Sequence, residues 1–185
     1  MSWHQSLKAA FASRRPLEVS YFAGLWGLAC NSIHFIDLVA WWSGEALVSV
    51  DTSGLDHHWH ESKRAGYFEI TGELVARFSN GTSLRLISKK DAQAQSIQVA
   101  LSDGVSWEVD EPAGTARSSI GDQLDGCIEF QSQMSGRLVD NILQQGKCDL
   151  PSLDESSSMH TIFLDAMLAH WNFSQNRNDD HVPIT

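Results

Sequence analysis

The strongest constraint on this chain is a β-hairpin signal in its middle third. Apolar and polar residues alternate over 97–101 and again over 105–109, and Asp103-Gly104 lies between the two runs. Alternation of this kind is typical of strands with one buried face, and an Asp-Gly pair favours a tight hairpin turn. The segment therefore predicts two antiparallel strands that belong to a sheet with two different faces.

A second hairpin is predicted earlier in the chain. Residues 67–78 form a long strand pattern with Gly72 as a bulge or bend, and Asn80-Gly81 supplies the turn before Leu84 and Leu86. Further strands are expected at 46–51 and at 115–120. Several strands joined by short turns indicate an antiparallel meander.

Helices are expected on both sides of these strands. A capping-box pattern at Ser2 opens a helix to about residue 12, and a strand over 17–23 follows it. Later helices are expected over 131–145 and 154–173. The order of elements indicates an α+β fold: an open, mainly antiparallel β-sheet with helices packed on one face. Burying the other face against a second copy predicts a homodimer or higher homo-oligomer.

The helix expected over 32–43 is unusual in its composition. Asn31 is a plausible N-cap and Gly44 a C-terminal stop, and the helix between them is apolar almost all round. Such a helix is buried, so His34 and Asp37 inside it need partners. They form either a structural pair or part of a polar site.

Charge and cysteine content exclude several classes of protein. The chain has 13 Lys+Arg and 23 Asp+Glu, which gives a net charge of −10 and opposes binding to nucleic acid. Three separated cysteines favour reduced thiols rather than a disulfide framework. The N-terminus has no leader pattern, and the longest apolar run is too short to span a bilayer. We therefore expect a soluble, cytoplasmic protein without a membrane partner.

The functional reading of the apolar helix places a pocket at its N-terminus. A glycine-rich turn would direct Cys30, Asn31 and His34 into that pocket, where a neutral imidazole can move a proton to or from a substrate hydroxyl. A helix N-terminus also favours bound anionic or polar groups.

A histidine cluster lies further along. His57, His58 and His60 surround Trp59, but neighbouring side chains on a strand or loop point apart, so a metal site is disfavoured and a solvated or substrate-facing loop is the simpler reading. Lys63-Arg64 is a solvated charge pair or an anion clamp. The sequence contains no G-x-G-x-x-G and no phosphate-binding loop of the G-x-x-x-x-G-K type.

The segment from Gly24 to Gly44 carries H-x-x-D-x-x-x-x-x-x-G and resembles the second half of the Gfo/Idh/MocA oxidoreductases, the family of glucose–fructose oxidoreductase and inositol dehydrogenase. Four further matches follow in order: Gly72-Glu-Leu, Phe78-x-Asn80-Gly81, Ile142-Leu-x-x-Gly146 and His160-x-x-Phe-Leu-x-Ala-Met-Leu. The resemblance covers nearly the whole chain.

The resemblance implies the C-terminal domain of an enzyme whose N-terminal Rossmann domain binds NAD or NADP. This chain lacks the glycine fingerprint and the family's Glu-Lys-Pro motif, so no Rossmann domain and no cofactor are expected in it. The family histidine falls on His34. Many members have an aspartate four residues earlier, where this chain has Cys30, and Asn31 is the nearest polar substitute.

The expected organisation is a single substrate-binding and oligomerisation domain over 1–185. It comprises an N-terminal helix (1–15), the helix 32–43 with the sheet (16–120), two helices (121–173) and a tail (174–185).

The leading hypothesis is the substrate-binding and dimerisation half of an NAD(P)-dependent sugar or polyol oxidoreductase that is inactive alone. The small molecule would be a sugar or a nucleotide-sugar-like compound. His34 and Asn31 are the catalytic candidates. The substrate-binding candidates are Cys30, Asp37, Trp59, Lys63 and Arg64. The alternative is a non-catalytic sugar-binding or dimerisation module of the same fold.

Overall fold

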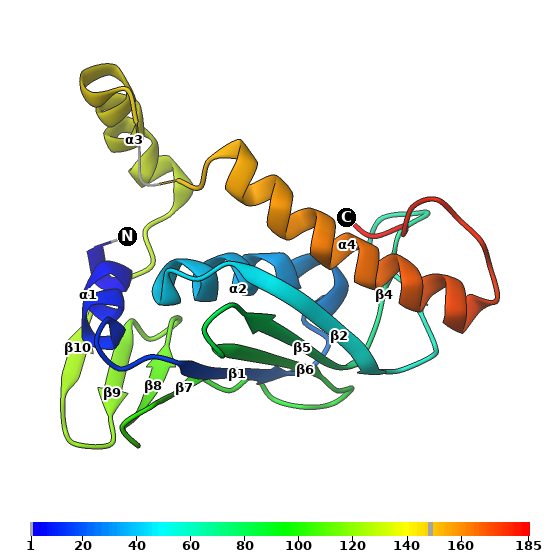
Figure 1. The fold of residues 1–185 in the computed structure, drawn as a ribbon, viewed down its shortest axis with the longest axis horizontal. Helices are drawn as coiled ribbons and strands as arrows, with labels where there is room; N and C mark the ends of the chain where they lie inside the picture. The colour runs from blue at the N-terminus through cyan, green and yellow to red at the C-terminus, as the bar shows by residue number, and fades with distance from the viewer. Residues whose placement is uncertain (1, 148–149) are drawn as a thin grey trace.

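The computed structural model describes residues 2–147 and 150–185. Four helices and ten strands occur in this part of the chain (Figure 1). The elements in order are α1 (Ser2–Phe11), β1 (Leu17–Ala23), α2 (Leu28–Ser43), β2 (Leu47–Leu55), β3 (His60–Glu61), β4 (Phe68–Glu69), β5 (Gly72–Phe78), β6 (Ser83–Ser88), β7 (Ile97–Leu101), β8 (Ser106–Asp110), β9 (Thr115–Ser118), β10 (Gln123–Asp125), α3 (Gln131–Gln145) and α4 (Leu153–Gln175).

Eight strands form one open sheet in the order β10-β9-β8-β7-β1-β6-β5-β2, and β3 pairs with β4 in a separate two-stranded sheet. The hairpins at Asn80-Gly81 and Asp103-Gly104 join β5 to β6 and β7 to β8 antiparallel. The predicted α+β class and the mainly antiparallel open sheet are therefore confirmed.

The strand order corrects the expected meander. β1 lies between β6 and β7, parallel to β6 and antiparallel to β7, so the two hairpins are not neighbours. The sheet is consequently mixed. The long strand expected over 67–78 is also divided, because β4 leaves the main sheet and pairs with β3. β10 is a strand that the sequence pattern did not indicate.

The helices lie over one face of the main sheet (Figure 1). α2 packs on β6, and α4 packs on both α2 and β2. The alternation along β6 follows this arrangement: Leu84 and Leu86 are fully buried beneath the helices, whereas Arg85 between them is exposed on the other face. Burial of this apolar face is the main stabilising contribution to the fold.

α3 is an exception, because it projects away from the sheet (Figure 1). The side chains of Val139, Ile142 and Leu143 on this helix are about half exposed or more. The helix expected over 131–145 is confirmed as an element, and its apolar positions do not form part of the core.

The C-terminal segment docks against β4 without forming a strand of its own. The Phe68 N–H donates a hydrogen bond to the Pro183 carbonyl (2.8 Å), and Val182 is buried. Among the described helices, none combines the length and the apolar character that crossing a membrane requires.

Candidate functional site

A cavity with a volume of about 910 Å³ opens between α1, α2 and the start of α4. His34 and Asp37 of α2 line one wall, and His4 and Lys8 of α1 line another. Glu155, near the start of α4, borders it as well. Ligand sites in proteins commonly occupy about 300–1,000 Å³. The cavity is therefore large enough for a monosaccharide or a larger polyhydroxylated ligand.

The N-terminus of α2 is closed, which corrects the pocket expected there. The buried Glu69 carboxylate (8% exposed) accepts hydrogen bonds from the backbone N–H groups of Ala29 (2.8 Å) and Cys30 (3.3 Å). Gly27 precedes the helix at φ 76°, a conformation that suits glycine. Because Glu69 already provides the negative charge that a helix N-terminus favours, no free anion site remains at this end.

Asn31 is not the N-cap, because α2 begins one turn earlier than expected. Its amide Nδ2 donates to the carbonyls of Trp26 (2.8 Å) and Gly27 (3.1 Å). The side chain therefore stabilises the turn that enters the helix. Its catalytic assignment remains a prediction.

Cys30 lies beside Glu69, and burial together with that carboxylate raises the pKa of its thiol to about 11. The thiol is therefore protonated near neutral pH and is a poor base. Cys30 and Asn31 are outside the lining of the cavity. The substrate-binding assignment of Cys30 also remains a prediction.

His34 and Asp37 lie where α2 faces the cavity. His34 is exposed and Asp37 is half-buried, so α2 is not buried all round as its composition suggested. Burial raises the pKa of the Asp37 carboxyl, and the nearby His34 opposes that rise. The two groups are therefore electrostatically coupled. An accessible imidazole beside a carboxylate is an arrangement that can accept and return a proton.

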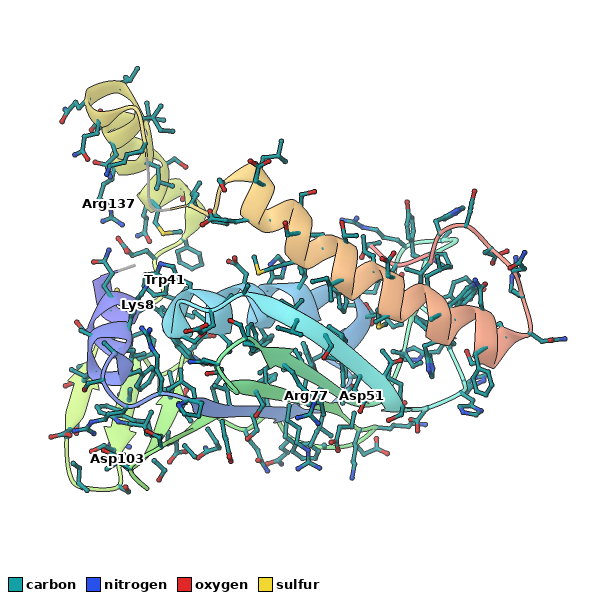
Figure 2. All side chains as sticks on the ribbon, in the orientation of Figure 1. Lys8, Trp41, Asp51, Arg77, Asp103 and Arg137 are labelled. Carbon is teal, nitrogen blue, oxygen red and sulfur yellow. The ribbon has the colours of Figure 1, made fainter. Side chains whose placement is uncertain are left out.

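The wall formed by α1 was not found from the sequence. Lys8 Nζ lies 4.4 Å from the centroid of the Trp41 ring, a cation–π contact across the gap between α1 and α2 (Figure 2). His4 and Glu111 lie on the same cavity, with 3.1 Å between His4 Nε2 and Glu111 Oε1. No local pattern links residues 4 and 111, because only the tertiary fold brings them together.

The histidine segment does not form a metal site in the described part of the chain, where no group of three metal-binding side chains occurs. Trp59 is buried, and its indole Nε1 donates to Ser174 Oγ (3.0 Å). The ring packs edge-on against Trp171 (5.1 Å between centroids). Trp59 is therefore a core residue rather than an open binding platform.

Lys63 and Arg64 are exposed in the turn between β3 and β4 and are not part of the cavity lining. An anion-binding role for Lys63 and Arg64 remains a prediction.

His170 packs against Trp59, and burial lowers the pKa of the His170 imidazole.

A dinucleotide cofactor does not fit the described residues. α2 follows β1 through a glycine-containing turn, but its N-terminal N–H groups are occupied by Glu69. A dinucleotide fold requires such groups for the pyrophosphate, together with a parallel sheet. The main sheet contains a single parallel pair, β1 with β6, among the described strands. The N-terminus of α2 therefore lacks the free N–H groups that would hold a pyrophosphate.

No family model matches the chain, and no curated protein matches its sequence. Solved structures do match its fold. The UDP-N-acetylglucosamine 3-dehydrogenase of Acidithiobacillus ferrooxidans superposes with a TM-score of 0.64 at 15% identity, over 92% of this chain and 58% of that one. The aldose-aldose oxidoreductase of Caulobacter crescentus gives 0.57 at 13% identity, over 94% and 57%.

A third structure, the myo-inositol dehydrogenase of Lactobacillus casei, gives a TM-score of 0.52 at 13% identity, over 97% of this chain and 58% of that one. The chain thus spans less than two thirds of the length of these oxidoreductases. The resemblance to the Gfo/Idh/MocA fold stated from the sequence is confirmed at the level of the fold.

Proposed function

We propose that this chain is the substrate-binding and dimerisation half of an NAD(P)-dependent sugar or polyol oxidoreductase. The observation that supports this most strongly is the position of His34 and Asp37 on a cavity of about 910 Å³. The fold around that cavity is the one found in sugar oxidoreductases. The free thiols of Cys30 and Cys127 agree with a reducing compartment, so we place the protein in the cytoplasm.

In this proposal His34 handles the hydroxyl proton of the substrate. A ring nitrogen accepts the proton as the carbinol is oxidised, and it returns the proton in the reverse direction. Asp37 stabilises the imidazolium that forms. The nicotinamide, which accepts the hydride when bound, is held by a nucleotide-binding part that the described residues do not supply.

A second candidate function is a non-catalytic sugar-binding module of the same fold. Cys30 favours it, because a thiol with a pKa of about 11 replaces the carboxylate that many related enzymes carry at that position. The coding sequence upstream of Met1 distinguishes the two. A strand, a G-x-G-x-x-G turn and a helix encoded there would favour the oxidoreductase.

Binding through His34 is tested by calorimetric titration of the chain with glucose and with myo-inositol. We expect His34→Ala to weaken binding about tenfold, because a hydrogen bond to an uncharged ligand is lost from a preformed site. His58→Ala is the matched control, since His58 is exposed and outside the lining of the cavity. Failure of both glucose and myo-inositol to bind, or equal binding by the two variants, would contradict the proposal.

Dimerisation is proposed through the sheet face that the helices leave open. Val75 is on this face, between Asp51 of β2 and Arg85 of β6 in the strand register. Figure 2 shows Asp51 and Arg77 near this part of the sheet. This face of the sheet carries charges of both signs. A two-fold axis can place a positive group of one copy against a negative group of the other, which suits pairing between two copies of the chain.

Light scattering after size exclusion should give twice the 20.5 kDa mass of one chain. Val75→Lys should shift the protein to the monomer, because a two-fold interface contains each new charge twice. Val139→Lys on α3 serves as the control, as Val139 is half exposed elsewhere on the molecule. A monomeric wild-type chain, or a Val75→Lys variant that stays dimeric, would count against this interface.

A further inference from the structure

α3 carries an apolar stripe that is largely uncovered in the described part of the chain. Val139 and Ile142 are about half exposed, and Leu143 is 79% exposed. Met134 and Leu138 extend the stripe toward the start of the helix, at the spacing that puts side chains on one face. Single exposed apolar residues are common on proteins, but a contiguous set on one helix face indicates a contact surface.

The helix has little support in its present position. Figure 1 shows α3 away from the sheet, and α3 makes no extensive contact with another described helix or strand. It has 15 residues, and isolated helices of about 12–15 residues are only marginally stable in water. The ion pair between Arg137 and Glu129 (3.1 Å) joins it only to the residues directly before it. α3 therefore requires a surface on which its apolar face can pack.

The matching surface is the α2 wall of the cavity. Leu38 and Trp41 are partly buried and line the cavity, and they follow His34 at intervals of about one turn, so the three side chains share one face of α2. At about 1.5 Å per residue, this face extends for about 10 Å and the stripe from Met134 to Ile142 for about 12 Å. The two faces therefore match in length, and both offer apolar side chains.

α3 is also held at the rim of this cavity. Met134, in its first turn, already lines the cavity, and Leu150 and Pro151 line it after the end of the helix. Segments linked in this way reach effective concentrations of about millimolar at a neighbouring surface. A second copy or another protein would have to compete from solution with this contact within the chain. The α2 wall is therefore the partner that the connectivity of the chain favours.

We propose that α3 is a lid that closes over the cavity, with its apolar stripe packed against Leu38 and Trp41 of α2. The helix pivots at its first turn, and its last two turns move from solvent onto the cavity wall. Arg137 and Asp140 are on the opposite side of α3 and stay in water. The closed arrangement predominates in the free chain, because the helix is supported only there. Closure also covers His34 and removes water from around its imidazole.

Hydrogen–deuterium exchange of the full chain, measured by mass spectrometry, tests the closure. We expect the α3 amides to exchange at least about a hundredfold more slowly than those of an unstructured chain, because a lone helix of this length gives far weaker protection. The protection should persist when the protein is diluted. Exchange at the rate of a lone helix would overturn the inference. Protection that is lost on dilution would also overturn it, because a second copy would then be the partner of α3.

Two neighbouring residues of α3 provide a matched pair of variants. Leu143→Asp places a charge on the apolar stripe, and Gln144→Asp places the same charge on the polar side of the helix. We expect Leu143→Asp to speed exchange of the α3 amides about tenfold or more, because closure would bury an unpaired carboxylate. Gln144→Asp should leave exchange close to that of the wild type. Equal effects of the two substitutions would contradict a lid that closes with its apolar side inward.

The wall of the cavity is tested with Trp41→Ala. Trp41 is only partly buried, so its truncation removes apolar surface from the wall and leaves the core filled. The α3 amides should exchange about threefold faster or more, while those of β5 keep their wild-type rates. Leu25→Ala is the control, since Leu25 is 60% exposed and outside the lining. Unchanged α3 exchange in Trp41→Ala would refute closure on this wall. These measurements use no sugar, so their failure leaves the proposed function intact.

Discussion

Replacing Trp42 with alanine is expected to destabilise the chain by about 3–5 kcal/mol, the usual cost of truncating a fully buried tryptophan. Trp42 has no exposed surface, and its ring packs edge-on against Phe11 of α1 (5.4 Å, 84°). It also supports the His4 ring. Denaturant unfolding followed by tryptophan fluorescence and by circular dichroism measures the change.

Trp41→Ala is the control for this prediction. Trp41 is the next residue of α2, but it is only partly buried and faces the cavity. Its truncation should therefore cost clearly less stability than that of Trp42. If the two variants lose the same free energy of unfolding, the packing of α1 on α2 differs from that described.

Replacing Glu69 with alanine is the second large effect. The substitution leaves the N–H groups of Ala29 and Cys30 without an acceptor and removes a negative charge from the N-terminus of α2. We expect a loss of about 2–4 kcal/mol, because an unpaired buried donor costs about 1–3 kcal/mol. Glu69→Gln should lose less, since the amide oxygen can still accept a hydrogen bond.

Glu61→Ala is a matched control for Glu69, because Glu61 is on the neighbouring strand of the same small sheet and is exposed. Thermal unfolding of the three variants should rank Glu61→Ala closest to the wild type and Glu69→Ala furthest from it. A Glu69→Ala variant with wild-type stability would show that α2 is capped in another way.

Local sequence patterns were sufficient for the elements that depend on neighbouring residues. The strand over 17–23 and the helix over 131–145 were predicted with the bounds that the structure has. Both hairpins follow from Asn80-Gly81 and Asp103-Gly104, since their turns depend on two residues. These predictions needed no information about tertiary contacts.

The start of α2 could not be predicted in the same way. Asn31 is a good N-cap by composition, but Glu69, nearly forty residues away in sequence, caps the helix one turn earlier. The position of β1 between β6 and β7 likewise depends on pairing with strands that are distant in the sequence. Neither hydrophobic periodicity nor turn chemistry carries this information.

The residues of the candidate site show the same difference between local sequence patterns and long-range contacts. His34 and Asp37 were found from the sequence because polar residues stand out in an apolar helix. His4 and Glu111 were missed, because each is ordinary in its own segment and they meet only through packing. Trp59 was expected to face a ligand, and the structure buries it against Trp171.

A crystal structure of the chain with bound glucose tests most directly whether the cavity beside His34 is a sugar site. We expect sugar density between α1 and α2, with a hydroxyl within hydrogen-bond distance of His34. Sugar bound only at another surface, with this cavity unchanged and His34 without a contact, would contradict it.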